Sequence, residues 1–234
     1  MSTVLLVRHG LTPMTGPVLA GHTPGVVLDD RGRKQAAALA QRVAALPLTA
    51  VVTSALERCV ETAEAVLAAQ RDAGRAPEWH VDDRLIECRY GDWTGRPIKE
   101  LARDPLWKVV QTQPSAVRFP GGESLVEVAA RAVSAVRDWD SRLGANAVWV
   151  ACSHGDVIKA ILADALGLHL DQFQRIVVDP GSASVVRYTD TRPFVVRVND
   201  TGGDVSGLLP PPRRRRRRTP SSDAVVGGGS GAGV

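Results

Sequence analysis

Two histidines in this chain each follow a short apolar run that is typical of a buried β-strand. The first run, 3–7, is followed by Arg8 and then His9. The second run, 147–152, is followed by a serine and then His154. A glycine comes directly after each histidine. If both strands are parallel in one sheet, the imidazoles meet at its carboxyl edge, where open α/β folds bind ligands. Arg8 adds a permanently charged guanidinium group, which can donate two parallel hydrogen bonds to phosphate oxygens. These residue types favour phosphoryl transfer with a histidine nucleophile.

A second arginine, Arg58, follows the short strand predicted at 50–53. Ser54 and Glu57 have the spacing of a capping box, which predicts a helix from 54 to about 70. Arg58 then lies in the first turns, at a helix end that favours anions. The alternative is a surface ion pair with a glutamate one turn further along the helix.

Four motifs occur in the order in which the histidine phosphatase superfamily has them, and the chain resembles that superfamily. The motifs are Arg8-His9-Gly10-x-Thr12, Ser54-x-x-x-Arg58-x-x-x-Thr62-Ala63, Glu87-Cys88-Arg89-Tyr90-Gly91 and Ser153-His154-Gly155. The resemblance covers residues 2 to about 200. The superfamily contains cofactor-dependent phosphoglycerate mutases and many phosphatases. Within it, the chain looks most like an actinobacterial group named for phosphomutase or acid phosphatase activity.

The resemblance implies a role for each of five catalytic residues. His9 would attack phosphorus and form a phosphohistidine, which divides one difficult hydrolysis into two steps. Arg8, Arg58 and His154 would hold the phosphoryl oxygens, and each such donor is worth roughly 2–4 kcal/mol. Glu87 would give a proton to the leaving group and later take one from water.

The same resemblance implies the residues that bind substrate. These are Thr15, Gly21 and Tyr90. The backbone amide of Gly155, at a predicted helix start, is a further candidate donor to the phosphoryl group. The proton donor has alternatives close to Glu87 in the sequence, namely Asp82, Asp83 and Asp92.

Other kinds of phosphoryl chemistry lack their motifs in this sequence. There is no Gly-x-x-x-x-Gly-Lys-Ser/Thr loop, and none of the three cysteines is followed by an arginine six positions on. The spacings typical of zinc sites are missing as well, so we expect no metal and no cofactor. A phosphomonoester hydrolase is the favoured function. A phosphoglycerate mutase-type phosphomutase and a non-catalytic phospholigand-binding protein are the alternatives.

The predicted elements alternate between strands and helices, which indicates a single-domain, three-layer α/β/α fold with a mostly parallel central sheet. We expect strands at 3–7, 50–53, 78–81, 147–152, 177–178, 183–188 and 194–198, and helices at 31–46, 54–70, 125–143 and 156–166. Four prolines between 97 and 120 predict short helices that form a lid. Trp93, Trp107 and Phe119 belong either to an apolar mouth beside this lid or to the core.

The C-terminal residues 205–234 differ in composition from the catalytic domain expected at 1–204. They contain a triple proline, six consecutive arginines at 213–218 and a Gly/Ser-rich end. Removing those arginines and Asp223 from the net charge of +4 leaves −1 for residues 1–212, so the pI of 9.3 comes from the tail. We expect a disordered tail that makes at most weak, salt-sensitive contacts with polyanions.

The remaining features of the sequence indicate where the protein is located and what it binds. The sequence contains no run of about 18 apolar residues, so we expect no membrane span. A predicted strand begins almost at the first residue, so we expect no signal peptide. Cys59, Cys88 and Cys152 are too widely spaced for a disulfide framework, so a cytoplasmic location is expected. The expected partner is a small phosphorylated substrate. The sequence leaves the oligomeric state open, with a dimer as one option.

The sequence predicts hydrolysis rather than isomerisation of phosphoglycerate. Mutases of the superfamily carry an adjacent arginine pair in a longer insertion, whereas the only basic residues of the segment 105–124 are Lys108 and Arg118. In the first phosphate-binding loop, Thr15 stands where the family usually has an asparagine. We expect phosphate release from an aryl phosphate to exceed isomerisation of 3-phosphoglycerate by far, with or without bisphosphoglycerate. Isomerisation faster than phosphate release would contradict the prediction.

Overall fold

The computed structural model describes residues 1–203 and Gly227. Its centre is a six-stranded sheet with the strand order β3-β2-β4-β1-β5-β6. The strands are β1 (Ser2–Arg8), β2 (Ala50–Thr53), β3 (Glu78–Val81), β4 (Val148–Ser153), β5 (Ala183–Tyr188) and β6 (Pro193–Asp200). The first four strands in this order are parallel, and β5 and β6 are antiparallel to their neighbours. The predicted mostly parallel sheet is confirmed.

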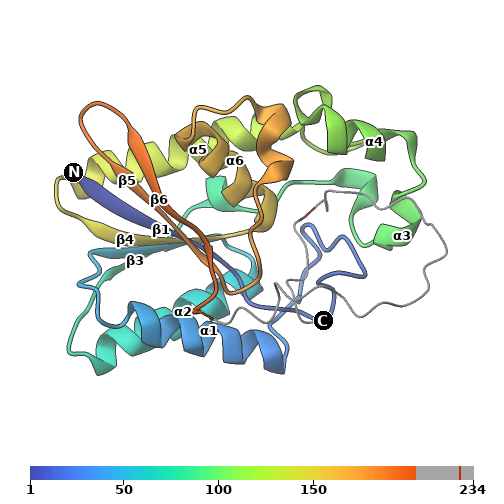
Figure 1. Ribbon diagram of the computed structural model, residues 1–234. Coiled ribbons are helices and arrows are strands. Elements are labelled where there is room, and N and C mark those ends of the chain that lie inside the picture. Colours follow the sequence, from blue (N-terminus) through green and yellow to red (C-terminus); the bar gives the residue numbers. More distant parts are fainter. Residues whose placement is uncertain (204–226, 228–234) are drawn as a thin grey trace.

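Helices cover both faces of the sheet, as the three-layer prediction requires (Figure 1). The helices are α1 (Asp30–Val43), α2 (Glu57–Asp72), α3 (Ile98–Leu101), α4 (Pro105–Thr112), α5 (Leu125–Leu143) and α6 (Gly155–Ala165). One face carries α1 and α2, and the opposite face carries α5 and α6. Short 3-10 turns lie at Asp83–Leu85, Gly91–Trp93, Pro114–Ala116 and Leu170–Arg175.

Side-chain alternation along β1 divides the core into two layers. Val4 and Leu6 pack into the cluster that contains α5 and α6, whereas Leu5 and Val7 pack into the cluster of α1 and α2. Successive strand residues point to opposite faces, so an all-apolar strand is buried on both sides. This is why β1 has a continuous apolar run.

Three predictions about the elements are wrong in detail. Helix α2 begins at Glu57, and its N-cap is Leu56 rather than Ser54, with no side-chain cap bond among the described residues. The Ser54 hydroxyl lies 2.8 Å from His154 Nε2 and accepts from the amide of Leu56 over 3.4 Å. Residues 177–178 belong to the loop before β5 rather than to a strand. The first long helix ends at Val43, three residues earlier than predicted.

The segment 97–119 forms α3, α4 and a 3-10 turn, as the prolines predict. The aromatic residues beside it belong to the core and do not line a mouth. Trp93 packs against Phe119 with ring centroids 5.3 Å apart and against Trp107 at 6.1 Å, and all three rings are buried. The predicted disorder of the tail and the boundary at 204/205 lie outside the described residues.

Helix α1 approaches the loop after β1 so closely that only glycine fits at position 32. A Cβ at Gly32 would lie 2.0 Å from the carbonyl oxygen of Leu11, and one at Gly10 would lie 2.5 Å from the carbonyl oxygen of Gly32. The contact holds the residues after His9 against the helix.

The replacement Gly32→Ala therefore tests this packing. Alanine in a helix normally stabilises by about 1 kcal/mol relative to glycine. Here we expect a loss of about 1–3 kcal/mol in the free energy of unfolding, measured with urea, because the backbone must move. Lys34→Ala, an exposed position on the same helix, is the control and should change stability by less than about 0.5 kcal/mol. A Gly32→Ala protein as stable as the wild type would show that the loop is not packed in this way.

Candidate active site

The two histidines lie together because β1 and β4 are neighbouring parallel strands. The register pairs Arg8 with Ser153, and the His9 amide donates to the Ser153 carbonyl over 3.1 Å. The imidazole centroids of His9 and His154 are 5.2 Å apart, with 60° between the ring planes. The prediction that both reach one edge of the sheet is confirmed.

His9 is held as a neutral imidazole with a defined tautomer. Burial is the main cause that lowers its pKa well below the ordinary value, and the charges of Arg58 and Arg8 lower it further. Its Nδ1 lies 2.7 Å from the carbonyl oxygen of Gly10, which can only accept, so Nδ1 carries the hydrogen. The lone pair of the neutral ring is therefore on Nε2, as a nucleophile requires.

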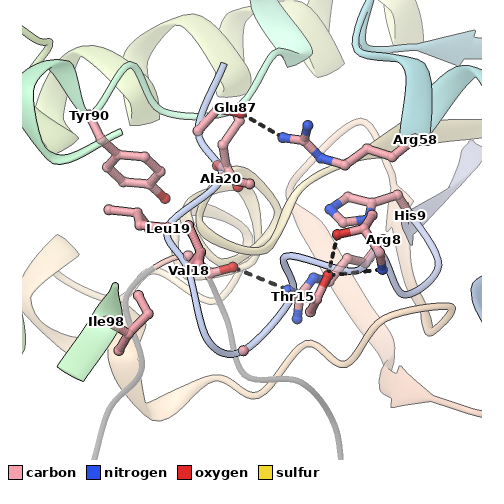
Figure 2. A pocket seen from close by; sticks show the side chains of 14 residues that line it. Arg8, His9, Thr15, Val18, Leu19, Ala20, Arg58, Glu87, Tyr90 and Ile98 are labelled. Carbon is pink, nitrogen blue, oxygen red and sulfur yellow. Dashed lines mark hydrogen bonds between the residues drawn. The ribbon is translucent and has the colours of Figure 1, made fainter. Parts of the chain in front are cut away.

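Two buried guanidinium groups stand beside this imidazole (Figure 2). Arg8 Nη1 donates to the carbonyl of Val178 over 2.7 Å, and its Nη2 donates to the carbonyl of Gly227 over 3.2 Å. Arg58 Nη2 donates to the carbonyl of Gly21 over 2.8 Å, whereas its buried Nη1 has no hydrogen-bond partner in the described part of the chain. These cations suit a bound phosphoryl group.

Glu87 lines the same pocket and is almost completely buried. Burial raises the pKa of its carboxyl group to about 7; Asp156 adds to the rise and Arg58 opposes it. Its Oε1 accepts from the amide of Cys88 over 2.9 Å, and its backbone carbonyl accepts from Arg131 over 3.0 Å. A carboxyl group that titrates near neutrality can both donate and accept a proton.

His154 is fully buried behind His9 and does not line the pocket. Its Nε2 lies 2.8 Å from the Ser54 hydroxyl, and its Nδ1 lies 3.9 Å from Glu87 Oε2. Burial lowers its pKa well below the ordinary value, and the charge of Arg58 adds to the decrease. His154 is thus a neutral ring in contact with His9 and with Glu87.

The residues expected to bind substrate fall into two groups. Thr15, Gly21 and Tyr90 line the pocket together with four of the predicted catalytic residues, whereas Gly155 does not line it and is the first residue of α6. The Thr15 hydroxyl accepts from the amide of Thr12 over 3.1 Å, within its own loop. The Tyr90 hydroxyl donates to Asp156 over 2.8 Å.

The sequence analysis missed Asp156, Lys159 and Gly227 as neighbours of the site. Asp156 and Lys159 are both buried on α6, with Nζ and Oδ1 3.8 Å apart. An acid and a base three positions apart among the apolar residues of the first turns of a helix were an available signal, because buried charges are paired or functional. Nothing in the sequence pattern indicates Gly227.

The structure offers no metal site within the residues that it describes. No three His, Cys, Asp or Glu side chains among them are arranged to hold an ion.

No helix among the described residues is long and apolar enough to cross a membrane.

Comparisons with known proteins agree with this geometry. Residues 4–201 match the model of the histidine phosphatase superfamily (branch 1). Phosphoserine phosphatase 1 of Hydrogenobacter thermophilus is 30% identical over 207 residues, which are 86% of this chain and 93% of that protein. A relative with a phosphoglycerate mutase name in Cronobacter sakazakii is 32% identical over 214 residues, 89% of this chain and 95% of its own length.

The fold is also that of solved structures. The mycobacterial glucosyl-3-phosphoglycerate phosphatase superposes with a TM-score of 0.74 at 25% identity, over 85% of this chain and 99% of that one. The chain belongs to the histidine phosphatase superfamily. It is a histidine-type phosphatase that acts on phosphomonoesters.

Proposed function

We propose that this pocket hydrolyses the phosphomonoester of a small metabolite, with His9 as the nucleophile. The observation that carries the proposal is the neutral, buried His9, whose Nε2 is unprotonated beside the guanidinium groups of Arg8 and Arg58. The two cations attract a dianionic phosphoryl group, and the neutral nucleophile does not repel that group.

In the first step, His9 Nε2 attacks phosphorus and the bond between phosphorus and the ester oxygen breaks. Charge in this loose transition state spreads over the three equatorial oxygens, which Arg8 and Arg58 stabilise from the lining of the pocket. His154, which does not line the pocket, would act through its contacts with His9 and Glu87. The Glu87 carboxyl group donates its proton to the departing alkoxide. The products are the free alcohol and a phosphohistidine.

In the second step, water attacks the phosphorus of the phosphohistidine. The Glu87 carboxylate takes a proton from the water as the P–N bond breaks, which restores neutral His9 and releases inorganic phosphate. Because the pKa of Glu87 lies near 7, the group can serve as the acid and then as the base at neutral pH.

Hydrolysis is favoured over the mutase alternative by the first phosphate loop. A mutase must retain the phosphorylated intermediate, but the Thr15 hydroxyl is already engaged with Thr12 in its own loop. Relatives named for phosphoserine and for glucosyl-3-phosphoglycerate support a phosphate ester of a small polar metabolite as the substrate. Turnover of such an ester would exclude the non-catalytic alternative.

The finer assignments are also proposals. We place the enzyme in the cytoplasm, which the three free cysteines support. We place it among the actinobacterial members of the superfamily, in line with the mycobacterial phosphatase named above, although its relatives come from varied bacteria.

Replacement of the nucleophile gives the direct test of the mechanism. We expect His9→Ala to lose turnover of an aryl phosphate and to lose the acid-labile, alkali-stable label from a radioactive phosphate ester, because the replacement removes the nitrogen that attacks phosphorus. Phosphate binding and the unfolding curve should stay close to those of the wild type. The control is His169→Ala, whose exposed side chain lies outside the pocket and which should retain activity. Activity of His9→Ala near the wild-type level would refute the mechanism.

The pH dependence tests Glu87 separately. The acid form of Glu87 exists below a pKa of about 7, so kcat/KM for an alkyl phosphate should fall tenfold per unit above that pH. An aryl phosphate needs less protonation of its leaving group and should fall less. Glu87→Gln should remove the alkaline limb and lower the alkyl rate by roughly 100- to 10,000-fold. An unchanged profile in Glu87→Gln would assign the proton transfer to another group.

A further inference from the structure

A buried carboxylate, Asp156, lies next to the phosphate pocket but has no part in the mechanism above. It stands in the first turn of α6, two residues after His154, and is completely shielded from solvent. Its Oδ2 accepts from the Tyr90 hydroxyl over 2.8 Å and from the Gly227 amide over 3.0 Å. The helix start that places His154 therefore also places an acceptor in contact with two residues that line the pocket, Tyr90 and Gly227.

The other oxygen of this carboxylate has unused hydrogen-bonding capacity. Asp156 Oδ1 is buried without a hydrogen-bond partner in the described residues, and Lys159 Nζ is 3.8 Å away. A buried acceptor left without a partner costs about 1–3 kcal/mol, and native structures seldom keep one without a reason. The carboxylate can therefore accept more hydrogen bonds than the described residues donate to it.

Gly227 shows what kind of group fits between Arg8 and Asp156. Its amide donates to Asp156 Oδ2, and its own carbonyl oxygen accepts from Arg8 Nη2 over 3.2 Å. Gly227 also lines the pocket that contains His9 and Glu87. The space therefore holds a compact polar unit that points a donor toward Asp156 and an acceptor oxygen toward the arginine.

We propose that Asp156 selects the leaving group of the substrate by accepting a hydrogen bond from its amino or hydroxyl group, in the place that the Gly227 peptide takes in this structure. The inference rests on the proposed function and specifies its substrate class: O-phosphorylated amino acids and hydroxy acids. An ester without such a donor leaves Asp156 Oδ2 with the Tyr90 hydroxyl as its donor, so the site favours the ester that adds a second hydrogen bond to this charged oxygen.

Three phosphate esters that differ in one substituent test the proposal. O-Phosphoserine, 3-phosphoglycerate and 3-phosphooxypropanoate carry an amino group, a hydroxyl group or hydrogen at the same carbon. We expect the wild-type kcat/KM to be roughly 10- to 100-fold higher for the better donor-bearing ester than for 3-phosphooxypropanoate, as for a hydrogen bond to a charged group. Phosphoserine as the better of the two would indicate an ammonium donor, and 3-phosphoglycerate a hydroxyl donor.

The variants Asp156→Asn and Asp156→Ala should reduce this ratio to within about threefold of unity. Removal of the charge also lowers the pKa of Glu87, because Asp156 is one of the causes that raise it. That change affects all three esters alike and cancels in the ratio, as does any loss of folded protein. Asp164→Asn is the matched control, since it makes the same change on the same helix at a partly exposed residue paired with Arg137, and it should keep the wild-type ratio.

An aryl phosphate separates failure of this inference from failure of the proposed function. Wild-type protein that hydrolyses the aryl phosphate but does not distinguish the three esters, or Asp156 variants that keep the wild-type ratio, would overturn the inference alone. A wild-type chain that releases phosphate from none of the four esters would overturn the proposed function together with it.

Discussion

The parallel register of β1 and β4 is the constraint on which the rest of the site depends. It sets Arg8 level with Ser153, so the chain leaves both strands at the same height and His9 meets His154. A slip of one residue would exchange the two faces of β1 and move Leu5 and Val7 out of the cluster with α1 and α2. The apolar alternation that builds both core layers thereby fixes the alignment of the two imidazoles.

The charges at this edge act on one another because they are buried together. Burial keeps His9 neutral by lowering its pKa, Arg58 and Arg8 add to this effect, and the same cations attract a phosphoryl dianion. Asp156 and burial hold Glu87 partly protonated against the opposing effect of Arg58. In water these interactions would be screened, whereas in a low-dielectric pocket they set the protonation states that the two-step reaction requires. The geometry and the acid–base properties of the site thus have one origin.

The backbone around Glu87 shows how distant segments hold one short motif in place. Arg131 on α5 donates to the carbonyls of Arg84, Ile86 and Glu87, and it pairs with Glu123. Because the segment 86–90 has no strand or helix of its own, these bonds replace those of regular structure. A planar guanidinium group can serve several carbonyls at once, which an ammonium group does less well.

The sequence by itself determined the layered fold and the meeting of His9 and His154, because apolar strand runs are local patterns and parallel strands bring their ends together. It placed Arg58 at a helix start, and it placed Glu87 at the site through the resemblance to the superfamily. Only the tertiary structure decided what each side chain contacts. Ser54 has the spacing of a helix cap yet bonds His154, 100 residues away, and Gly227 reaches Asp156 across 71 residues. The pKa of Glu87 likewise follows from burial and from Asp156. Such contacts and their desolvation arise from packing between segments remote in the chain, which no periodicity or spacing of residue types encodes.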